Sequence, residues 1–277
     1  MTETFVHPAA FVEKGAEIGA GSHIGPFCHI GANAVIGEGA HFVSHVTVAG
    51  HTTIGPRAQA WPGAVIGGPP QSHRYKGEPT RLVLGADAVI REAATLNTGT
   101  ADGRGETTVG DRLYLMTGAH IGHDCIVGNN VTMANNSPLG GHVELGDFVN
   151  IGGNAAVHQF VRIGHHAFIG GMVAVVGDVI PYAMVYPGGG SRGRLRGFNV
   201  VGLKRSGLGT KELARLRSAY RKLFEADTPL ADNIEPVAAE FAGFEPVEDI
   251  LRFLTERGRR MYTMPARGHG DDAGSAG

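Results

Sequence analysis

Residues 23–42 read HIGPFCHIGANAVIGEGAHF and place a large apolar side chain at every sixth position. These anchors are Ile24, Ile30, Ile36 and Phe42, and a small residue stands four places after each of the first three. Glycine directly follows the same three anchors. A helix does not tolerate glycine at this density, because each interior glycine costs about 1 kcal/mol relative to alanine. The stretch therefore predicts short extended segments joined by tight corners, with glycine supplying the positive φ that a corner needs.

The six-residue period runs through most of the chain. It starts at Val6, includes ten large apolar residues in its first eleven positions, pauses after Ile66 and resumes at Leu84. After a second pause it continues from Val109 to Val175. Such hexapeptide arrays are typical of parallel β-helices.

The period also predicts how the coils are built. Residues two apart in a strand point to the same side, so the small residue and the anchor that follows it both point inward. Three segments close a triangular coil of about 18 residues, and coils stack about 4.8 Å apart through parallel ladders. We therefore predict a mainly β protein with a parallel β-helix over residues 1–190 and external loops near residues 67–82 and 97–108. The period does not determine the handedness of the coil.

The last part of the chain lacks the period. From Thr210, a candidate N-cap, the sequence TKELARLRSAYRKLFEA carries apolar residues on one helical face. Residues 229–243 and 246–258 each begin with proline, which is favoured at the first position of a helix. We predict a C-terminal helical domain over residues 191–264 and a disordered tail over residues 265–277.

The composition narrows the functional classes. The net charge of −2 gives no general basic character, so we expect no nucleic-acid partner. Two cysteines cannot form a disulfide framework, which favours a reducing compartment. The N-terminus has neither a basic start nor a long apolar run, so we expect no signal peptide and no membrane span. A cytoplasmic protein is the expectation.

Residues 118–128, GAHIGHDCIVG, combine histidine, aspartate and cysteine at defined positions of the period. His120 precedes an anchor and so points outward, whereas His123 and Asp124 fall at the following corner. Cys125 occupies a small inward slot, where a buried thiol is an inert space-filler. This placement argues against a cysteine nucleophile.

Two further histidines extend the cluster. His142 follows His123, and His158 follows His142, each at an interval close to the length of one coil. Because one coil takes about 18 residues, these side chains rise along one flank of the prism. Core packing does not explain outward histidines on one wall, and histidine serves as a base near neutral pH. We interpret the wall as a catalytic site, with ordinary surface histidines as the alternative.

Zinc binding competes with this interpretation, because imidazoles from stacked coils can hold the ion. Parallel β-helix carbonic anhydrases do so between subunits, but two of their ligands are more widely spaced along the chain than His120 and His123 are here. We therefore predict no metal ion and no other cofactor. A non-enzymatic, ice-binding β-helix is disfavoured because it needs flat rows of Thr-x-Thr on one wall, which this chain lacks.

Longer stretches resemble one known family. AHIGHDCIVGNN, GGHVELGDF, AAVHQFVRIG and GFNVVGLKRSG are similar, in this order, to the acyl-carrier-protein–UDP-N-acetylglucosamine O-acyltransferases of lipid A biosynthesis. HIGPFCHIG near the start and YKGEPTR in the first external loop match as well, and the likeness extends to about Tyr262. The resemblance implies a left-handed parallel β-helix, against the usual right-handed crossover rule. It also implies a homotrimer with active sites in the clefts between subunits.

The resemblance implies the reaction too. A 3-hydroxyacyl chain moves from acyl carrier protein to the 3-hydroxyl of UDP-N-acetylglucosamine, the first step of lipid A biosynthesis. The substrate alcohol is the nucleophile, and His123 matches the general base that takes its proton. The backbone N–H of Gly141 matches the donor to the thioester oxyanion. Asp124 either orients a neighbour or is a solvated corner carboxylate.

The remaining matches are substrate contacts: His120, His142 and His158 for the substrates in general, Gln159 and Asn199 for the nucleotide sugar, and Arg205 for the phosphates, where a fixed cation is useful. Arg74 stands where the family commonly has lysine. Gly171 matches the position that limits acyl-chain length, and glycine there leaves room for a long chain.

Three residues depart from the family pattern. Ser72 replaces an aspartate that contacts the sugar, Asn97 replaces a histidine, and Ser206 replaces a second arginine. Ser72 leaves open whether the acceptor is a hydroxyl or an amine at the 3-position of the sugar.

Two further observations concern partners and relatives. A basic group of residues surrounds the start of the helical domain: Lys204, Arg205, Arg215, Arg217, Arg221 and Lys222. It would steer an acidic acyl carrier protein, with a solvated helix face as the alternative. The sister N-acyltransferases carry a uridine-binding domain before their repeats, and here the repeats begin at Val6, which disfavours that family.

Overall fold

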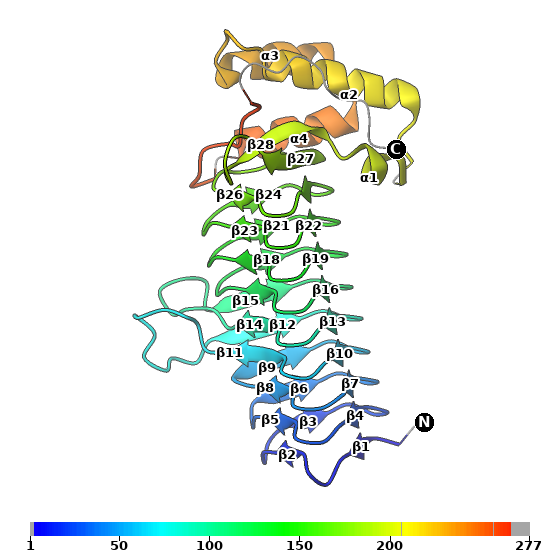
Figure 1. Cartoon of the computed structure of the whole chain (residues 1–277), viewed down its shortest axis with the longest axis vertical. Coiled ribbons are helices and arrows are strands. Elements are labelled where there is room, and N and C mark those ends of the chain that lie inside the picture. Colours follow the sequence, from blue (N-terminus) through cyan, green and yellow to red (C-terminus); the bar gives the residue numbers. More distant parts are fainter. Residues whose placement is uncertain (1–2, 206, 257, 267–277) are drawn as a thin grey trace.

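The computed structural model describes residues 3–205, 207–256 and 258–266 of the chain. Within these ranges the strands form three sheets, parallel except for the last pair of strands in one of them, that wind into one column, and the helices gather at its C-terminal end (Figure 1). We call the three walls of the column sheets A, B and C, in the order in which the chain first visits them.

Sheet A contains, in spatial order, β1 (Phe5–Val6), β4 (His23–Ile24), β7 (His41–Phe42), β10 (Gln59–Ala60), β13 (Val89–Ile90), β16 (Tyr114–Leu115), β19 (Thr132–Met133), β22 (Asn150–Ile151), β25 (Phe168–Ile169), β27 (Ala183–Pro187) and β28 (Gly193–Phe198). Sheet B contains β2 (Phe11–Val12), β5 (His29–Ile30), β8 (Thr47–Val48), β11 (Val65–Gly68), β14 (Thr95–Asn97), β17 (His120–Ile121), β20 (Pro138–Leu139), β23 (Ala156–Val157) and β26 (Ala174–Val175). Sheet C contains β3 (Glu17–Ile18), β6 (Ala34–Ile36), β9 (His51–Ile54), β12 (Arg81–Leu84), β15 (Glu106–Val109), β18 (Ile126–Val127), β21 (Glu144–Leu145) and β24 (Arg162–Ile163).

The register of the strands confirms the triangular coil. Phe5 of β1 pairs with His23 of β4, which is three strands further along the chain, so three segments make one coil. One coil is longer than the others where the period first pauses. Gln59 pairs with Val89 in the next coil, and the loop that leaves the column lies between them in the sequence. The corners of the column form three edges, which we call AB, BC and CA after the sheets that they join. The coil period thus decides which edge each corner residue occupies.

The anchors and the small residues fill the interior of the column. From the second coil onward they are buried; Ile24 and Ile30, for example, are 0% exposed. Each such aliphatic side chain contributes roughly 1.5–3 kcal/mol when removed from water. Val6 in the first coil is 40% exposed, because no coil stacks beneath it.

The glycines that follow the anchors have a different role from the one predicted. Among the described residues only Gly67 of this group has a positive φ, and corners are turned by other residues, including Phe27 (φ 59°) and His142 (φ 60°). A Cβ at Gly25 would lie 1.8 Å from the carbonyl oxygen of Val43 in the next coil. These glycines are required by the close stacking of successive coils rather than by the turn itself.

Two loops leave the column at the BC edge. One joins β11 to β12 over residues 69–80, and the other joins β14 to β15 over residues 98–105. Both project from the same side of the column (Figure 1). Because they start one coil apart on sheet B, they lie beside each other at the level at which the histidine cluster begins.

The C-terminal part contains α1 (Val200–Arg205), α2 (Thr210–Leu223), α3 (Leu230–Glu240) and α4 (Glu245–Thr255). It begins with a strand rather than a helix, since β28 pairs antiparallel with β27 and extends sheet A. The N-cap of α2 is Gly209 instead of Thr210, and its N–H donates to the Glu212 carboxylate. No helix in the described ranges is long and apolar enough to cross a membrane.

The end of the described chain returns to the column. Pro265 forms a bridge with Leu195, so the predicted disordered tail does not begin at residue 265. Residues 267–277 of that prediction lie outside the described residues.

Candidate active site

The BC edge brings most of the predicted site residues together. His120 lies on β17, and His123 and Asp124 form the corner that follows it. Gly141 and His142 form the corresponding corner one coil later. The rings of His123 and His142 meet edge to face with centroids 5.2 Å apart. The predicted wall of histidines from successive coils is therefore present.

His123 and Asp124 form a hydrogen-bonded dyad. Nδ1 of His123 lies 2.8 Å from Oδ2 of Asp124, whose side chain is fully buried. The solvated alternative for Asp124 is therefore wrong. Burial alone would raise the pKa of this carboxyl, but hydrogen bonds from His123, Thr100 and the Arg104 backbone outweigh burial and hold the pKa well below its usual range. The ionised carboxylate can only accept, so Nδ1 of His123 carries a proton, and in the neutral imidazole the lone pair is then on Nε2.

Gly141 lies directly against this imidazole. A Cβ at Gly141 would stand 2.4 Å from Cε1 and 2.6 Å from Nε2 of His123, so a side chain cannot occupy this position without moving the ring. Within the described part of the chain, the N–H of Gly141 donates no hydrogen bond. Gly141 and Nε2 of His123 thus stand side by side, an arrangement that suits acyl transfer.

His142 is held in a stack of rings. Its ring lies flat against Phe160 with centroids 4.5 Å apart, and the guanidinium of Arg259 lies 4.7 Å from the Phe160 centroid. Nε2 of His142 lies 3.6 Å from the Asp124 carboxylate. Burial lowers the pKa of His142, and although Asp124 opposes this, the charges of His123 and Arg259 add to it. His142 is therefore neutral near pH 7 and can either donate or accept a hydrogen bond.

His120 completes the group on the outer face of sheet B. Its Nδ1 lies 2.7 Å from the hydroxyl of Thr95, its neighbour on the adjacent strand β14. Burial, followed by the nearby His123, lowers its pKa. The outward orientation predicted for His120 is what places it beside His123.

Two arginines from the end of the chain join the same edge, and the sequence did not single them out. Nη2 of Arg260 lies 2.9 Å from Nδ1 of His158, and its Nε donates to the Gln159 carbonyl at 3.0 Å. Arg259 covers Phe160 next to them. The only signal was the pair of adjacent arginines itself, since their contacts lie far away along the chain.

The external loops reach this edge as well. Arg74 is exposed and pairs with Asp102 of the other loop at 3.1 Å. Ser72 accepts a hydrogen bond from the Arg74 N–H. Asn97 is 6% exposed, and within the described residues its Oδ1 has no hydrogen-bond partner. Ser206, the third departure from the family pattern, lies outside the described residues.

Three predicted residues lie elsewhere on the chain. Gly171 belongs to the AB edge, and Arg205 ends α1. Asn199 is buried at the CA edge, where its amide donates to the His166 carbonyl and its oxygen accepts from the Gly202 N–H. Within one chain these residues do not share an edge with His123.

A metal ion would have a defined place in this site. The nearest ligand atoms of His123, Asp124 and His142 all lie within 4.8 Å of one another. The donor set does not suit an ion as it stands, because Asp124 already accepts hydrogen bonds from Thr100, Arg104 and His123. The arrangement is that of a hydrogen-bonded carboxylate and imidazole.

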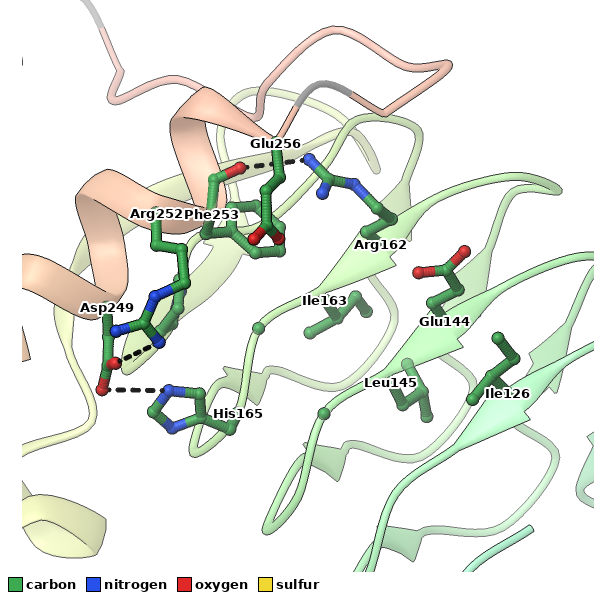
Figure 2. A pocket seen from close by; sticks show the side chains of 13 residues that line it. Ile126, Glu144, Leu145, Arg162, Ile163, His165, Asp249, Arg252, Phe253 and Glu256 are labelled. Atoms are coloured by element: carbon green, nitrogen blue, oxygen red, sulfur yellow. Dashed lines mark hydrogen bonds and ion pairs between the residues drawn. The ribbon is translucent and has the colours of Figure 1, made fainter. Parts of the chain in front are cut away.

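A separate hollow of about 300 Å³ lies between sheet C and α4 (Figure 2). Several of its polar groups bind one another: Asp249 lies 3.3 Å from His165 and 3.1 Å from Arg252, and Arg162 donates to the Phe253 carbonyl. None of the predicted site residues lines it. These contacts attach α4 to the coils.

Comparison with known proteins agrees with this geometry. The family description "Bacterial transferase hexapeptide (six repeats)" matches residues 15–50, and "Udp N-acetylglucosamine O-acyltransferase; Domain 2" matches residues 178–262. An acyl-[acyl-carrier-protein]–UDP-N-acetylglucosamine O-acyltransferase from Mesorhizobium japonicum is 52% identical over 272 residues, covering 98% of this chain and 96% of that protein. A protein of the same name from Rhizobium leguminosarum is 46% identical over 263 residues, covering 95% and 96%.

Solved structures lead to the same family. The UDP-N-acetylglucosamine acyltransferase of Campylobacter jejuni matches with a TM-score of 0.87 at 35% identity, covering 94% of this chain and 99% of that one. The Francisella novicida enzyme matches with a TM-score of 0.89 at 34% identity, covering 95% of each chain. The predicted left-handed parallel β-helix with C-terminal helices is thereby confirmed. With relatives this similar along nearly its whole length, the chain belongs to the UDP-N-acetylglucosamine O-acyltransferase family.

Proposed function

We propose that this protein transfers a 3-hydroxyacyl chain from acyl carrier protein to the 3-hydroxyl of UDP-N-acetylglucosamine, the first step of lipid A biosynthesis, and that His123 is the general base. The observation that carries this assignment is the dyad: Nδ1 of His123 is bound to the buried Asp124, and Nε2 lies beside Gly141 with no hydrogen-bond partner among the described residues. The names of the relatives support the two substrates.

The proposed chemistry needs no protein nucleophile. Nε2 of His123 takes the proton of the sugar hydroxyl while that oxygen attacks the thioester carbonyl. The carbonyl oxygen becomes an oxyanion, and the N–H of Gly141 donates to it. When the tetrahedral intermediate collapses, the C–S bond breaks and the thiolate takes the proton back from His123. Asp124 stabilises the imidazolium while it exists.

The remaining site residues bind the substrates. The same edge as the dyad carries His120, His142, His158 and Gln159. Arg74 lies on the loop over residues 69–80, which leaves the column at this edge. Burial keeps His120 and His142 neutral, which suits hydrogen bonds to sugar hydroxyls and the amide. In this proposal the acceptor is the hydroxyl; the small Ser72 makes the corresponding 3-amino sugar the competing substrate.

A second copy of the chain completes the site. Gly171, Asn199 and Arg205 lie away from the BC edge, so they reach a bound substrate only from a neighbouring subunit of a homotrimer. Large apolar side chains are exposed on sheet B and on the AB edge, with Phe11 at 65%, Phe27 at 62% and Met172 at 73%. In the proposed trimer a neighbouring subunit would cover such side chains. We place the enzyme in the cytoplasm, where its two buried thiols stay reduced.

The experiment that tests the function identifies the product. The protein is incubated with UDP-N-acetylglucosamine or its 3-amino analogue and with carrier proteins that bear 3-hydroxyacyl chains of different lengths, and the products are analysed by mass spectrometry. We expect an ester with a long acyl chain. Lack of any acylated sugar nucleotide would refute the proposed reaction, and acylation of only the amine would change the acceptor.

The base is tested by His123→Ala. We expect activity to fall at least ~100-fold while the circular dichroism spectrum is unchanged, because the variant lacks the imidazole that takes the proton in the proposed reaction. His41→Ala is the matched control, because His41 is an exposed histidine on β7 of sheet A, which does not adjoin the BC edge. We expect this variant to keep wild-type activity. Full turnover by His123→Ala would reject the assigned base.

A further inference from the structure

The loop over residues 98–105 surrounds the carboxylate that orients His123. The hydroxyl of Thr100 donates to Oδ2 of Asp124 at 2.6 Å, and the N–H of Thr100 lies 3.1 Å from both carboxylate oxygens. The N–H of Arg104 donates to Oδ1 at 2.7 Å. Among the described residues, every hydrogen bond to this carboxylate other than that of the imidazole thus comes from one loop.

The loop is folded around this contact. Thr100 is 3% exposed, and its carbonyl accepts hydrogen bonds from the N–H groups of Gly103 and Gly105. A Cβ at Gly103 would stand 2.7 Å from Cγ of Asp124 and 2.5 Å from the Thr100 hydroxyl. The N–H of Asp124 is held as well, by the hydroxyl of Thr107 at 2.8 Å. The carboxylate therefore cannot rotate without breaking several buried hydrogen bonds.

We infer that this loop is a clamp for Asp124 and that Thr100 is a positioning residue for the acyl transfer, acting through Asp124 on His123. The inference rests on the proposed function, in which His123 is the base. A carboxylate that is saturated with donors stays ionised and fixed, so it accepts from Nδ1 of His123 in one direction only. This keeps the lone pair of Nε2 aimed at the substrate, and misplacing a catalytic group by about 1 Å can cost roughly 100-fold in rate.

Thr100→Val tests the clamp, because it removes the hydroxyl and keeps the shape of the side chain. We expect kcat to fall roughly 10- to 100-fold with the KM for UDP-N-acetylglucosamine within about twofold, since Thr100 acts on the base and is itself buried. The acid limb of the kcat/KM profile is expected to move to higher pH. The limb moves because the variant loses one of the hydrogen bonds that lower the pKa of Asp124. The His123–Asp124 dyad therefore takes up a proton at a higher pH than in the wild type.

Two variants separate positioning from loop folding. Thr100→Ser keeps the hydroxyl and should restore both kcat and the position of the acid limb. Thr98→Val is the matched control, because Thr98 lies in the same loop and is equally buried but pairs with Thr80 rather than with Asp124. It should leave kcat and the pH profile unchanged. If Thr100→Val does not fold, Gly103→Ala, which presses on the carboxylate while keeping every donor, should lower kcat in the same way.

The outcomes that overturn the inference are distinct from those that overturn the function. Wild-type kcat and pH profile in Thr100→Val, together with an inactive His123→Ala, would reject the clamp and leave the base in place. Equal loss in Thr100→Val and Thr100→Ser with an unmoved acid limb would reduce Thr100 to a loop-folding residue. Full activity in His123→Ala would remove the base, and the clamp with it.

Discussion

At the scale of single residues, the site depends on space as much as on chemistry. Gly141 has no positive φ, so its backbone would accept alanine, yet the Cβ would stand 2.4–2.9 Å from three ring atoms of His123. Contacts this short force either the ring or the corner to move. The glycine is therefore needed by the imidazole, in addition to any use of its N–H.

Gly141→Ala is expected to lower kcat at least ~100-fold, since it would displace both the proposed base, His123, and the proposed oxyanion donor. The melting temperature should change little, so that the loss of kcat does not reflect unfolding. Gly153→Ala is the matched control: it occupies the same place in the six-residue period, and its Cβ would meet only the Asn135 carbonyl at 3.6 Å. Activity close to wild type in Gly141→Ala, measured by release of free carrier-protein thiol, would show that the ring has room to move.

The period of the sequence predicted part of this site and missed the rest for a physical reason. His123 and His142 stand about one coil apart, so counting residues was enough to place them together. Thr100 and Arg104 lie in a loop that has no period, and Arg259 comes from the far end of the chain, so nothing local indicated their contacts. The glycines that follow the anchors were assigned to the turns for the same reason. The six-residue period does not show which residues of the next coil lie against them.

At the scale of elements, α4 is attached to the column through a pair of half-buried histidines. Nδ1 of His165 lies 2.9 Å from Nδ1 of His166, and Nε2 of His165 lies 3.3 Å from Asp249 of α4. The short contact between the two Nδ1 atoms requires one to donate and the other to accept, so both rings cannot be protonated while it is kept. Burial lowers the pKa of both histidines. His120 and His142 are shifted in the same direction by burial.

These lowered pKa values predict that the fold is less stable in mild acid. The unfolded chain binds more protons than the folded one once the pH falls through about 6.5, so stability is lost from there down to the lower pKa of the folded state. We expect the urea midpoint to be lower at about pH 5.5 than at about pH 7.5. His166→Phe should make this difference smaller, because it removes one of the titrating imidazoles. The corner should accept phenylalanine, since Phe148 occupies the corresponding corner with φ 59°. His45→Phe, at an exposed corner, should not; equal pH dependence in all three proteins would contradict the prediction.

At the scale of the whole molecule, the shape of the column is the reason that the proposed site needs a second chain. A prism of stacked coils has three edges, and side chains on different edges point apart. The period places His123 on the BC edge and Gly171 on the AB edge, and Arg205 ends a helix beyond the last coil. These three residues therefore lie apart within one rigid column. In a cyclic trimer, one edge of each copy lies against another edge of its neighbour.

This arrangement predicts complementation between two inactive variants. In the proposed trimer each site takes His123 from one chain and Arg205 from the next, so His123→Ala and Arg205→Ala are each expected to be inactive alone. In randomly mixed trimers, about a quarter of the sites combine an intact His123 with an intact Arg205 on the neighbour, because each requirement is met half of the time. Co-expression from one plasmid should therefore restore about a quarter of wild-type activity, whereas mixing the two purified trimers should restore none until subunits exchange. Light scattering that gave the mass of a single chain, or co-expressed protein without activity, would mean that His123 and Arg205 do not meet across an interface.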